Sequence, residues 1–463
     1  MGVATPRKEY EQQLPGVTKN RDCASGQRAV KAKSTVYLKP LASQLNGTGG
    51  FTTDGKQEYE QYLSLALYFN AVGRTVDGST GLIHRKKPVI ELPAALEYLR
   101  DSIDSSTETL ASHIQASTRE NFITPRCGLL VDFPQSNERL SVADTERLNI
   151  RPKIMFFPYE SILNWRYGVV DGKRQLVLLV LVEAAVKIID KFETETVKNY
   201  RVLELIDGVY HSSLYNEDEN IKEEAQPIRM NGQYAREIPF YTMEPLGGNR
   251  SAVDDLVDVN LNHYNMFSAY ANKEHMCGFP IYWETGVTDA DDDKNVSVGV
   301  GAKWTSENDQ ASFGILETSG DGGSMRSYLE DRKAEMAALG ADMLKPSTSQ
   351  AESGEAKRLD KIAQNATAGD IANTVSTAYR SAIRAAAVWV NANPDEVKVE
   401  LNTDYIPGTI DPQMMSQLVA ALQSGQISYD TFYENLQKGE IASEGRSAEE
   451  ELALIASSET GMQ

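Results

Sequence analysis

One long helix, rich in alanine and poor in bulky side chains, is predicted for residues 352–391, ESGEAKRLDKIAQNATAGDIANTVSTAYRSAIRAAAVWVN. The pair Asn393-Pro394 ends this helix. Proline has no backbone N–H to donate, and its ring clashes with the preceding helical turn. Small side chains let neighbouring backbones approach this helix closely. The composition does not say which elements these neighbours are, so the surrounding sequence must be considered.

Two further helices precede it, separated by a segment with a different period. Apolar residues recur at helical spacing in residues 251–276 and 324–344. Between them, residues 279–318 have the character of a small β insert with an acidic loop, TDADDDKN. Pro346 ends the second helix, and a small polar loop leads into the alanine-rich one.

The first half of the chain changes from helical to strand-like character near residue 150. Residues 59–68, 94–103 and 107–121 follow helical patterns, and the first of these is expected to end before residues 71–88. Residues 153–243 are rich in β-branched and aromatic side chains and predict an antiparallel β meander. Its strongest turn signals are the Asp-Gly pairs, at Asp171-Gly172 and Asp207-Gly208.

The end of the chain predicts one strand and two short helices. The strand lies in residues 396–405, and the helices lie in residues 412–423 and 429–437. Gly425 and Gly439 stop the helices, and Ser428 is a suitable N-cap for the second. Together with the β meander, this predicts the α+β fold class.

The composition excludes several classes of protein. The formal net charge is −20, which argues against a protein that grips nucleic acid through clustered Lys and Arg. Cys23, Cys127 and Cys277 are far apart, so reduced thiols are expected rather than a disulfide framework or metal site. No apolar run approaches the roughly 20 residues that span a bilayer. The start of the chain has no secretory signal, so we expect a cytosolic protein without membrane contact.

Motifs for catalysis and metal binding are absent from the sequence. There is no GxxxxGK[ST] phosphate loop, no GxSxG nucleophile turn and no HExxH zinc pair. The loop that starts at Asp289 resembles a calcium loop, but Lys294 and Val300 occupy the positions that need Gly and Glu. We therefore expect no catalytic, cofactor-binding or metal-binding residues, no cofactor and no enzymatic activity. An enzyme with a dispersed site in the β region remains an alternative.

Four stretches, in this order, resemble portal proteins of tailed double-stranded DNA bacteriophages, which form the head-to-tail connector ring. They are YFNAVGRTVDGSTGLIHRKKP at residues 68–88, YESILNWRYGVVDGKRQLVLLVLVE at 159–183, LGADMLKPSTSQAESGEAKRLD at 339–360 and LVAALQSGQISYDTFYENLQKGEI at 418–441. The helix, insert, helix, loop and long helix also follow the order of that family. The resemblance covers residues 59–441, and the two ends of the chain match nothing in it.

The resemblance implies the portal fold, which is mainly helical with an antiparallel β wing region, long stem helices flanking a β-containing clip, and C-terminal crown helices. The expected segments are a flexible N-terminal segment (1–50), wing (51–245), stem helix one (246–278), clip (279–320), stem helix two (321–345), tunnel loop (346–356), long wing helix and strand (357–410), crown helices (411–441) and a disordered tail (442–463).

The resemblance also implies a function without chemistry. Portal proteins form a ring, usually a dodecamer, at one capsid vertex of the virion, and they assemble in the bacterial host cytoplasm. Double-stranded DNA is packaged and ejected through the ring, with transient and non-specific contact. Other implied partners are the large terminase subunit, the major capsid protein and scaffold, and head-completion or tail adaptor proteins. A different ring-forming head–neck adaptor is a further alternative, but adaptors are usually much shorter.

Candidate site residues follow from the same resemblance. Tunnel-loop residues expected to touch DNA are Lys345, Ser347, Thr348, Ser349, Gln350 and Ser353. Clip residues expected to receive the motor and adaptors are Asp289, Asp291, Asp292, Asp293 and Lys294. In a ring, the small residues of the long helix would permit close approach to neighbouring subunits, with Tyr379 and Trp389 anchoring one face; these small residues are Ala366, Ala378, Ala382, Ala385 and Ala386. A helix in the core of a single chain explains the same composition.

Overall fold

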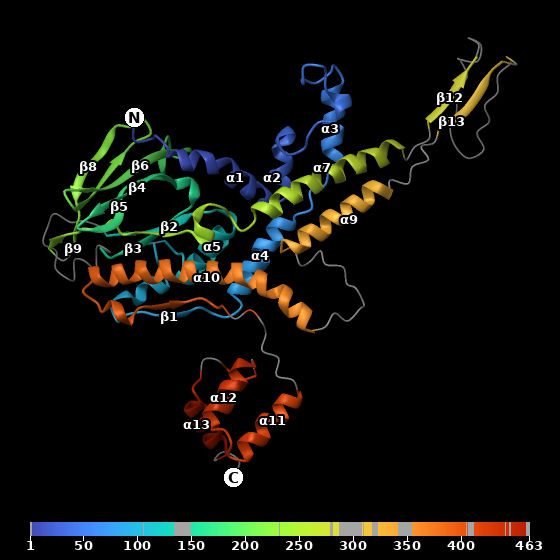
Figure 1. Ribbon diagram of the computed structural model, residues 1–463. Coiled ribbons are helices and arrows are strands. Elements are labelled where there is room, and N and C mark those ends of the chain that lie inside the picture. Colours follow the sequence, from blue (N-terminus) through green and yellow to red (C-terminus); the bar gives the residue numbers. More distant parts are fainter. Residues whose placement is uncertain are drawn as a thin grey trace. The chain divides into compact units, whose positions relative to one another are not determined.

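The chain divides into two units, Met1–Leu401 and Asn402–Gln463. A computed structural model describes residues 2–104, 106–133, 150–230, 232–277, 281–286, 308, 310–316, 323–340, 354–403, 405, 412–439, 441–443 and 446–459. For residues 276–277, 281–282, 316, 354–365, 412 and 458–459 it describes the backbone alone. Helices and strands are mixed (Figure 1), which confirms the α+β class.

The first 50 residues are ordered, so the expectation of a flexible N-terminal segment in residues 1–50 was wrong. They form α1 (Lys8–Ser25) and α2 (Gln27–Ala32), followed by the 3₁₀ turns η1 (Ser34–Val36) and η2 (Ala42–Gln44). Tyr10 stacks on Tyr159, with ring centroids 5.3 Å apart. The few apolar side chains of this polar stretch are buried by distant parts of the chain, and a local reading of the sequence does not reveal those contacts.

α3 (Gly55–Leu65) ends before residue 71, as predicted, and the segment that follows, for which no element was predicted, is another helix. This helix is α4 (Ala71–Ile83), capped by the Asn70 side chain, which accepts a hydrogen bond from the Gly73 backbone N–H. Gly73 serves packing, because a Cβ at this position would lie 2.5 Å from the Ala24 carbonyl oxygen. Gly73 therefore allows α4 to lie against the end of α1.

The predicted β meander is divided among three sheets, the smallest of which is the two-stranded pair of β9 (Arg229–Met230) and β10 (Gln233–Tyr234). β4 (Ile162–Val170), β5 (Lys173–Ile188), β6 (Thr194–Ile206), β7 (Val209–Tyr215) and β8 (Ile221–Pro227) form one antiparallel sheet in chain order. Asp171, Gly172, Asp207 and Gly208 all have positive φ, which confirms the two tight Asp-Gly turns.

A second sheet has the order β11-β2-β3, from β2 (Cys127–Asp132), β3 (Lys153–Phe157) and β11 (Phe240–Met243). Its central strand, β2, was not predicted. β3 and β11 pair with β2 and not with the strands of the larger sheet. Gly128 makes room for the Phe240 ring, because a Cβ there would lie 2.2 Å from that ring. The ends of the 153–243 segment therefore belong to this sheet rather than to one continuous meander.

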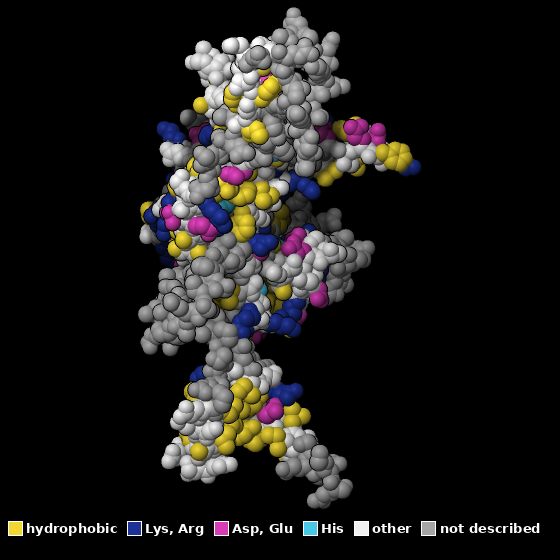
Figure 2. Space-filling model, turned by 90° about the vertical axis from the view of Figure 1, so that its right-hand side faces the viewer, with side chains coloured by type: hydrophobic (Ala, Val, Ile, Leu, Met, Phe, Trp, Pro, Cys, Tyr) yellow, Lys and Arg dark blue, Asp and Glu magenta, His cyan; other side chains and the backbone are white. Residues whose placement is uncertain are grey.

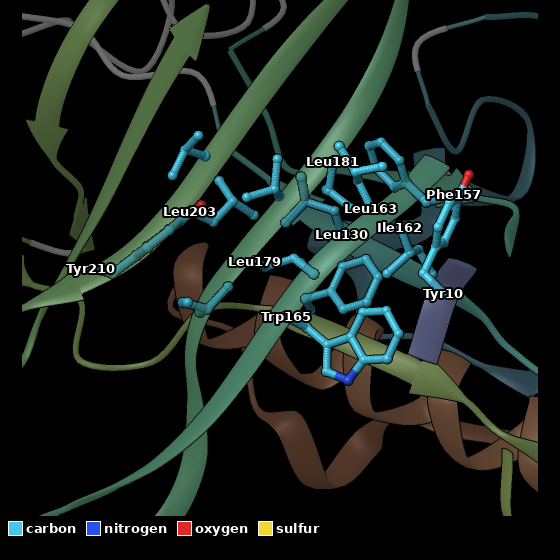
Figure 3. Close-up of a cluster of buried hydrophobic side chains, with 14 of the residues drawn as sticks. Tyr10, Leu130, Phe157, Ile162, Leu163, Trp165, Leu179, Leu181, Leu203 and Tyr210 are labelled. Atoms are coloured by element: carbon cyan, nitrogen blue, oxygen red, sulfur yellow. The ribbon is translucent and has the colours of Figure 1, made fainter. Parts of the chain in front are cut away.

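A hydrophobic cluster joins these sheets. Leu179, Leu181 and Leu203 of the larger sheet belong to one buried cluster with residues of the smaller sheet, such as Leu130 and Phe157 (Figure 3). Leu181 and Leu203 are fully buried. Truncating either side chain to alanine would cost about 2–5 kcal/mol, because lost burial and a cavity add together. The core of the first unit is thus built from both sheets.

The long alanine-rich helix is α10 (Gly354–Trp389), and it packs within its own chain. It contacts α5 (Leu110–Ile123), β2, β11 and the small strand β14 (Lys398–Glu400). Ala378, Ala382 and Ala386 are at most 4% exposed. The idea that these three small residues face neighbouring subunits was therefore wrong, because this chain already covers them. Ala366 is exposed and Ala385 is half-buried.

Several short elements complete the first unit. Of residues 94–103, which were expected to be helical, Ala94–Arg100 form a 3₁₀ helix. The short elements are β1 (Val89–Glu91), which pairs with β14, η3 (Ala94–Arg100), η4 (Tyr159–Ser161), β9 (Arg229–Met230), β10 (Gln233–Tyr234), η5 (Pro245–Gly248) and η7 (Pro394–Glu396).

The second unit contains α11 (Pro412–Gln423), α12 (Tyr429–Lys438) and α13 (Ala448–Glu459). The first two confirm the predicted helices, and the Ser428 side chain caps α12 by accepting from the Thr431 N–H. The third shows that the expectation of a disordered tail at residues 442–463 was wrong for residues 448–459. Its sequence, AEEELALIASSE, has three acidic residues in its first turn, which favour a helix N-terminus.

Candidate channel and docking regions

The predicted stem is represented by α7 (Asp254–Cys277) and α9 (Gly323–Ala338). The two helices lie side by side in Figure 1. Leu329 and Met336 of α9 are buried, and the Tyr328 hydroxyl donates to Asn262 Oδ1 of α7 at 2.8 Å. With 24 residues, α7 is about 36 Å long. Residues 341–345 of the expected second stem helix lie outside the described part of the chain.

A small antiparallel hairpin stands where the clip was expected. β12 (Ile281–Thr285) pairs with β13 (Ser312–Leu316), and Thr285 lies opposite Ser312. Gly314 leaves space for the Trp283 ring, because a Cβ would lie 2.5 Å from it. Only three residues separate α7 from β12, a span of about 14 Å at most. The hairpin is therefore tied closely to the end of α7.

The candidate residues that the resemblance supplied lie outside the described part of the chain. This holds for the tunnel-loop set Lys345, Ser347, Thr348, Ser349, Gln350 and Ser353. It holds equally for the clip set Asp289, Asp291, Asp292, Asp293 and Lys294. Of the loop predicted at residues 346–356, the structure describes only the backbone from Gly354, where α10 already begins.

Charged side chains of α9 form ion pairs with one another. On α9, Lys333 lies 2.9 Å from Glu330, and Arg332 lies 2.6 Å from Glu335. On the face of the molecule in Figure 2, Lys and Arg side chains lie among Asp and Glu side chains.

His263 of α7 is a feature that the sequence did not single out. It is 3% exposed and lies beside the Phe267 ring, and neither ring nitrogen has a hydrogen-bond partner among the described residues. Burial, and to a lesser extent the positive charge of Lys333, lower the pKa of His263 to about 4 against the opposing effect of Glu330. The imidazole is therefore neutral at pH 7 inside the helix pair.

His113 of α5 is buried too, but it is fully engaged, as expected for a core histidine. Its Nδ1 lies 2.6 Å from the Tyr379 hydroxyl of α10. Ser117 lies 2.7 Å from the same hydroxyl. Burial lowers the pKa of His113 to about 4. This cluster joins α5 and α10 through buried hydrogen bonds.

A pocket of about 350 Å³ lies beside β8 and the end of α10, and sequence reasoning missed it. We call it the β8 pocket. It is lined by the aromatic residues Phe133, Tyr210 and Trp389, the carboxylates Asp132, Glu223 and Glu224, and Arg201, Ser212, Gln226 and Ile228. Its residues come from five separate elements or their ends, so no local motif could have revealed it.

Burial raises the pKa of Asp132, which Arg201 and Lys153 partly oppose. Arg201 is itself held by Glu183 in two hydrogen bonds of 2.5 and 3.1 Å. The pocket is therefore lined by three carboxylates, those of Asp132, Glu223 and Glu224, whereas its one guanidinium, that of Arg201, is already paired with Glu183. The pocket combines aromatic walls with negative charge, which suits a cationic or aromatic side chain.

Within the described residues, no helix is long and apolar enough to cross a membrane. No group of three or more His, Cys, Asp or Glu in that part of the chain could hold a metal ion. Cys23 and Cys127 are buried free thiols.

Residues 253–390 match the family described as "Domain of unknown function (DUF4055)", a region that runs from the start of α7 to the end of α10. No curated protein matches the chain. Among solved structures, it is similar to a chain in a structure titled "Neck of native GTA particle computed with C12 symmetry". That alignment has 10% identity and a TM-score of 0.38, and it covers 79% of this chain and 89% of the other. A likeness this distant does not fix the role of the chain.

Proposed function

We propose that this chain is a portal protein, the subunit of a ring at one capsid vertex through which double-stranded DNA is packaged and ejected. The observation that carries the proposal is the arrangement of α7, the β12–β13 hairpin, α9 and α10. Two packed helices flank a small β hairpin, and the second leads toward a long helix in the wing. This is the order of stem, clip, stem and wing helix that the sequence resemblance implies.

The acidic character of the chain supports passage of DNA rather than tight binding. The net charge is −20, and like charge repels the phosphate backbone. A channel wall of this kind leaves DNA mobile, so contact would be transient and independent of sequence. In this proposal the ring performs no chemistry, and it serves as a platform for the terminase motor and the head-completion proteins.

Ring formation is the direct test. The purified full-length chain should sediment as a large oligomer in analytical ultracentrifugation at micromolar concentration, and negative-stain images should show rings with a central hole. Subunit number is not at stake, because recombinant rings can close with different numbers. Monomers or dimers alone, together with the absence of rings from capsids, would overturn the proposal.

The two predicted contact regions can be tested separately. Gln350→Cys should crosslink to DNA in stalled packaging complexes, whereas ready reaction with a maleimide too bulky for the channel would place that residue outside. Converting Asp289, Asp291, Asp292 and Asp293 to Asn should leave rings intact but weaken binding of the terminase motor or adaptor. Unchanged binding of both partners would remove the docking role from this acidic segment.

A further inference from the structure

Two strands of the larger sheet extend beyond their neighbours. β4 pairs with β5 only as far as Leu181, and β7 pairs with β6 only as far as Tyr200. From Glu183 opposite Asn199 to Ile188 opposite Thr194, β5 and β6 pair only with each other within the described residues. We call residues 183–199 the β5–β6 ribbon. A two-stranded ribbon is marginally stable on its own in water, and its open edges can pair with other chains.

The end of the ribbon carries exposed apolar side chains. Phe192 is 91% exposed, and Val186 and Ile188 are 70% and 75% exposed. The Asp190 carboxylate accepts hydrogen bonds from the backbone N–H groups of Phe192 at 2.7 Å and Glu193 at 2.9 Å. The Lys191 ammonium lies 5.4 Å from the Phe192 ring. The turn thus presents one aromatic ring and one cation to solvent, which is the type of side chain that anchors protein interfaces.

The β8 pocket offers the complementary chemistry. Its aromatic walls suit a phenyl ring, since offset or edge-on aromatic contacts are favourable. The Trp389 and Phe133 rings already meet edge-on with centroids 4.7 Å apart. Its exposed rim carries Glu223 and Glu224, opposite in charge to Lys191. A phenyl ring and a lysine ammonium that arrive together would therefore each find a matching surface.

We propose that the Lys191–Phe192 tip of one copy of this chain inserts into the β8 pocket of the neighbouring copy. This inference rests on the proposed ring. Phe192 is almost fully exposed in its own chain, so its own pocket does not receive it. The two contacting surfaces of each copy are different, which makes the contact heterologous. Repetition of a heterologous contact closes into a ring when the rotation between copies permits.

Engineered cysteines test this pairing. Phe192→Cys and Gln226→Cys are placed together in the full-length chain, because Gln226 is an exposed residue of the pocket and carries no charge. Mild oxidation should give a ladder of covalently linked subunits in the double variant and background levels in each single variant. The native cysteines Cys23, Cys127 and Cys277 are retained in all of these variants, so the single variants also report any crosslinking through them.

Two substitutions test the energetics. Phe192→Ser should weaken assembly by ~10-fold or more, as expected for an aromatic anchor. Val169→Ser is the matched control, because Val169 is 74% exposed on β4 and lies outside the proposed contact. Lys191→Glu should weaken assembly, and adding Glu223→Lys to it should restore part of the loss.

The outcomes separate this inference from the proposed function. Rings without a specific crosslink, and with equal effects of Phe192→Ser and Val169→Ser, would overturn the pairing and leave the portal proposal standing. Absence of rings from the unmodified chain would overturn the portal proposal itself. The pairing would also fall if Gln226→Cys in the dissociated chain were blocked from maleimide, since the chain's own segment would then fill the pocket.

Discussion

The Tyr379 hydroxyl of α10 lies 2.6 Å from Nδ1 of His113 on α5, although the two residues are 266 positions apart in the chain. The same hydroxyl donates to the His113 carbonyl oxygen at 2.9 Å. Tyr379 is fully buried, so its polar atom depends on these contacts. A single aromatic side chain thus fixes how the long helix lies against the first half of the chain.

Removing that hydroxyl should weaken the first unit. Tyr379→Phe leaves the His113 ring nitrogen without its partner, at a cost of about 1–3 kcal/mol. Thermal unfolding should show a lower midpoint than for the unmodified chain. Tyr167→Phe is the control, because Tyr167 is 40% exposed and its loss should matter little. Equal midpoints for the two variants would contradict the role of the buried hydroxyl.

Two of the glycines of α4, Gly73 and Gly78, should respond to alanine substitution in opposite directions. Gly73→Ala places a Cβ 2.5 Å from the Ala24 carbonyl oxygen, and should destabilise the fold by about 1–3 kcal/mol through overpacking. Gly78→Ala, on the same helix, meets nothing within 4 Å. It should stabilise by about 0.4–1 kcal/mol, because alanine has less freedom in the unfolded chain. Denaturant unfolding of both variants checks the pair, and a shift of the same sign in both would refute the close approach.

Acidification should weaken the α7–α9 helix pair through His263. Its pKa is about 4 in the fold against an ordinary value of 6.5, so the unfolded state binds a proton first as pH falls. Stability is therefore lost between pH 6.5 and 4, by about 2 kcal/mol at pH 5. His263→Leu should reduce the difference in unfolding midpoint between pH 7 and pH 5. His113 contributes a similar slope in both proteins, so an unchanged difference would exclude His263.

Arg126 should be needed to hold the start of β2. Its side chain is 6% exposed, lies 3.9 Å above the Trp165 ring and pairs with Glu244 at 2.6 Å. Arg126→Met should cost about 1–3 kcal/mol, because it leaves the partly exposed Glu244 without its partner. A double-mutant cycle with Glu244→Gln should show that the two effects are not additive. Full additivity would mean that the pair contributes nothing beyond packing.

Long periodic helices and tight turns could be predicted from the sequence, because their signals are local. The α7, α9, α10, α11 and α12 helices follow apolar spacing with Pro, Gly or Ser at their ends. The sequence did not reveal α1, α4 or β2, because distant contacts determine those elements. The packing role of Gly73, for example, depends on the Ala24 carbonyl oxygen beside it, and that contact cannot be read from the sequence.

Candidate residues could be predicted only by resemblance, and those positions remain predictions. The β8 pocket was not predictable, because Asp132, Tyr210, Glu223 and Trp389 meet only through tertiary structure. The same is true of His263, which in sequence is one polar residue among several on α7. Its lack of a partner depends on where α9 lies.

The position of α10 has a consequence for the order in which the protein is made. This helix packs against α5, β2 and β11, yet the ribosome synthesises it after most of the first unit. In the same way, β1 near residue 90 can pair only after β14 near residue 400 has been synthesised. Nascent chains that end before α10 carry the inner face of β2 and α5 uncovered, a state prone to aggregation. The first unit can therefore complete its core only once translation has passed this helix, and chains truncated before it lack that core.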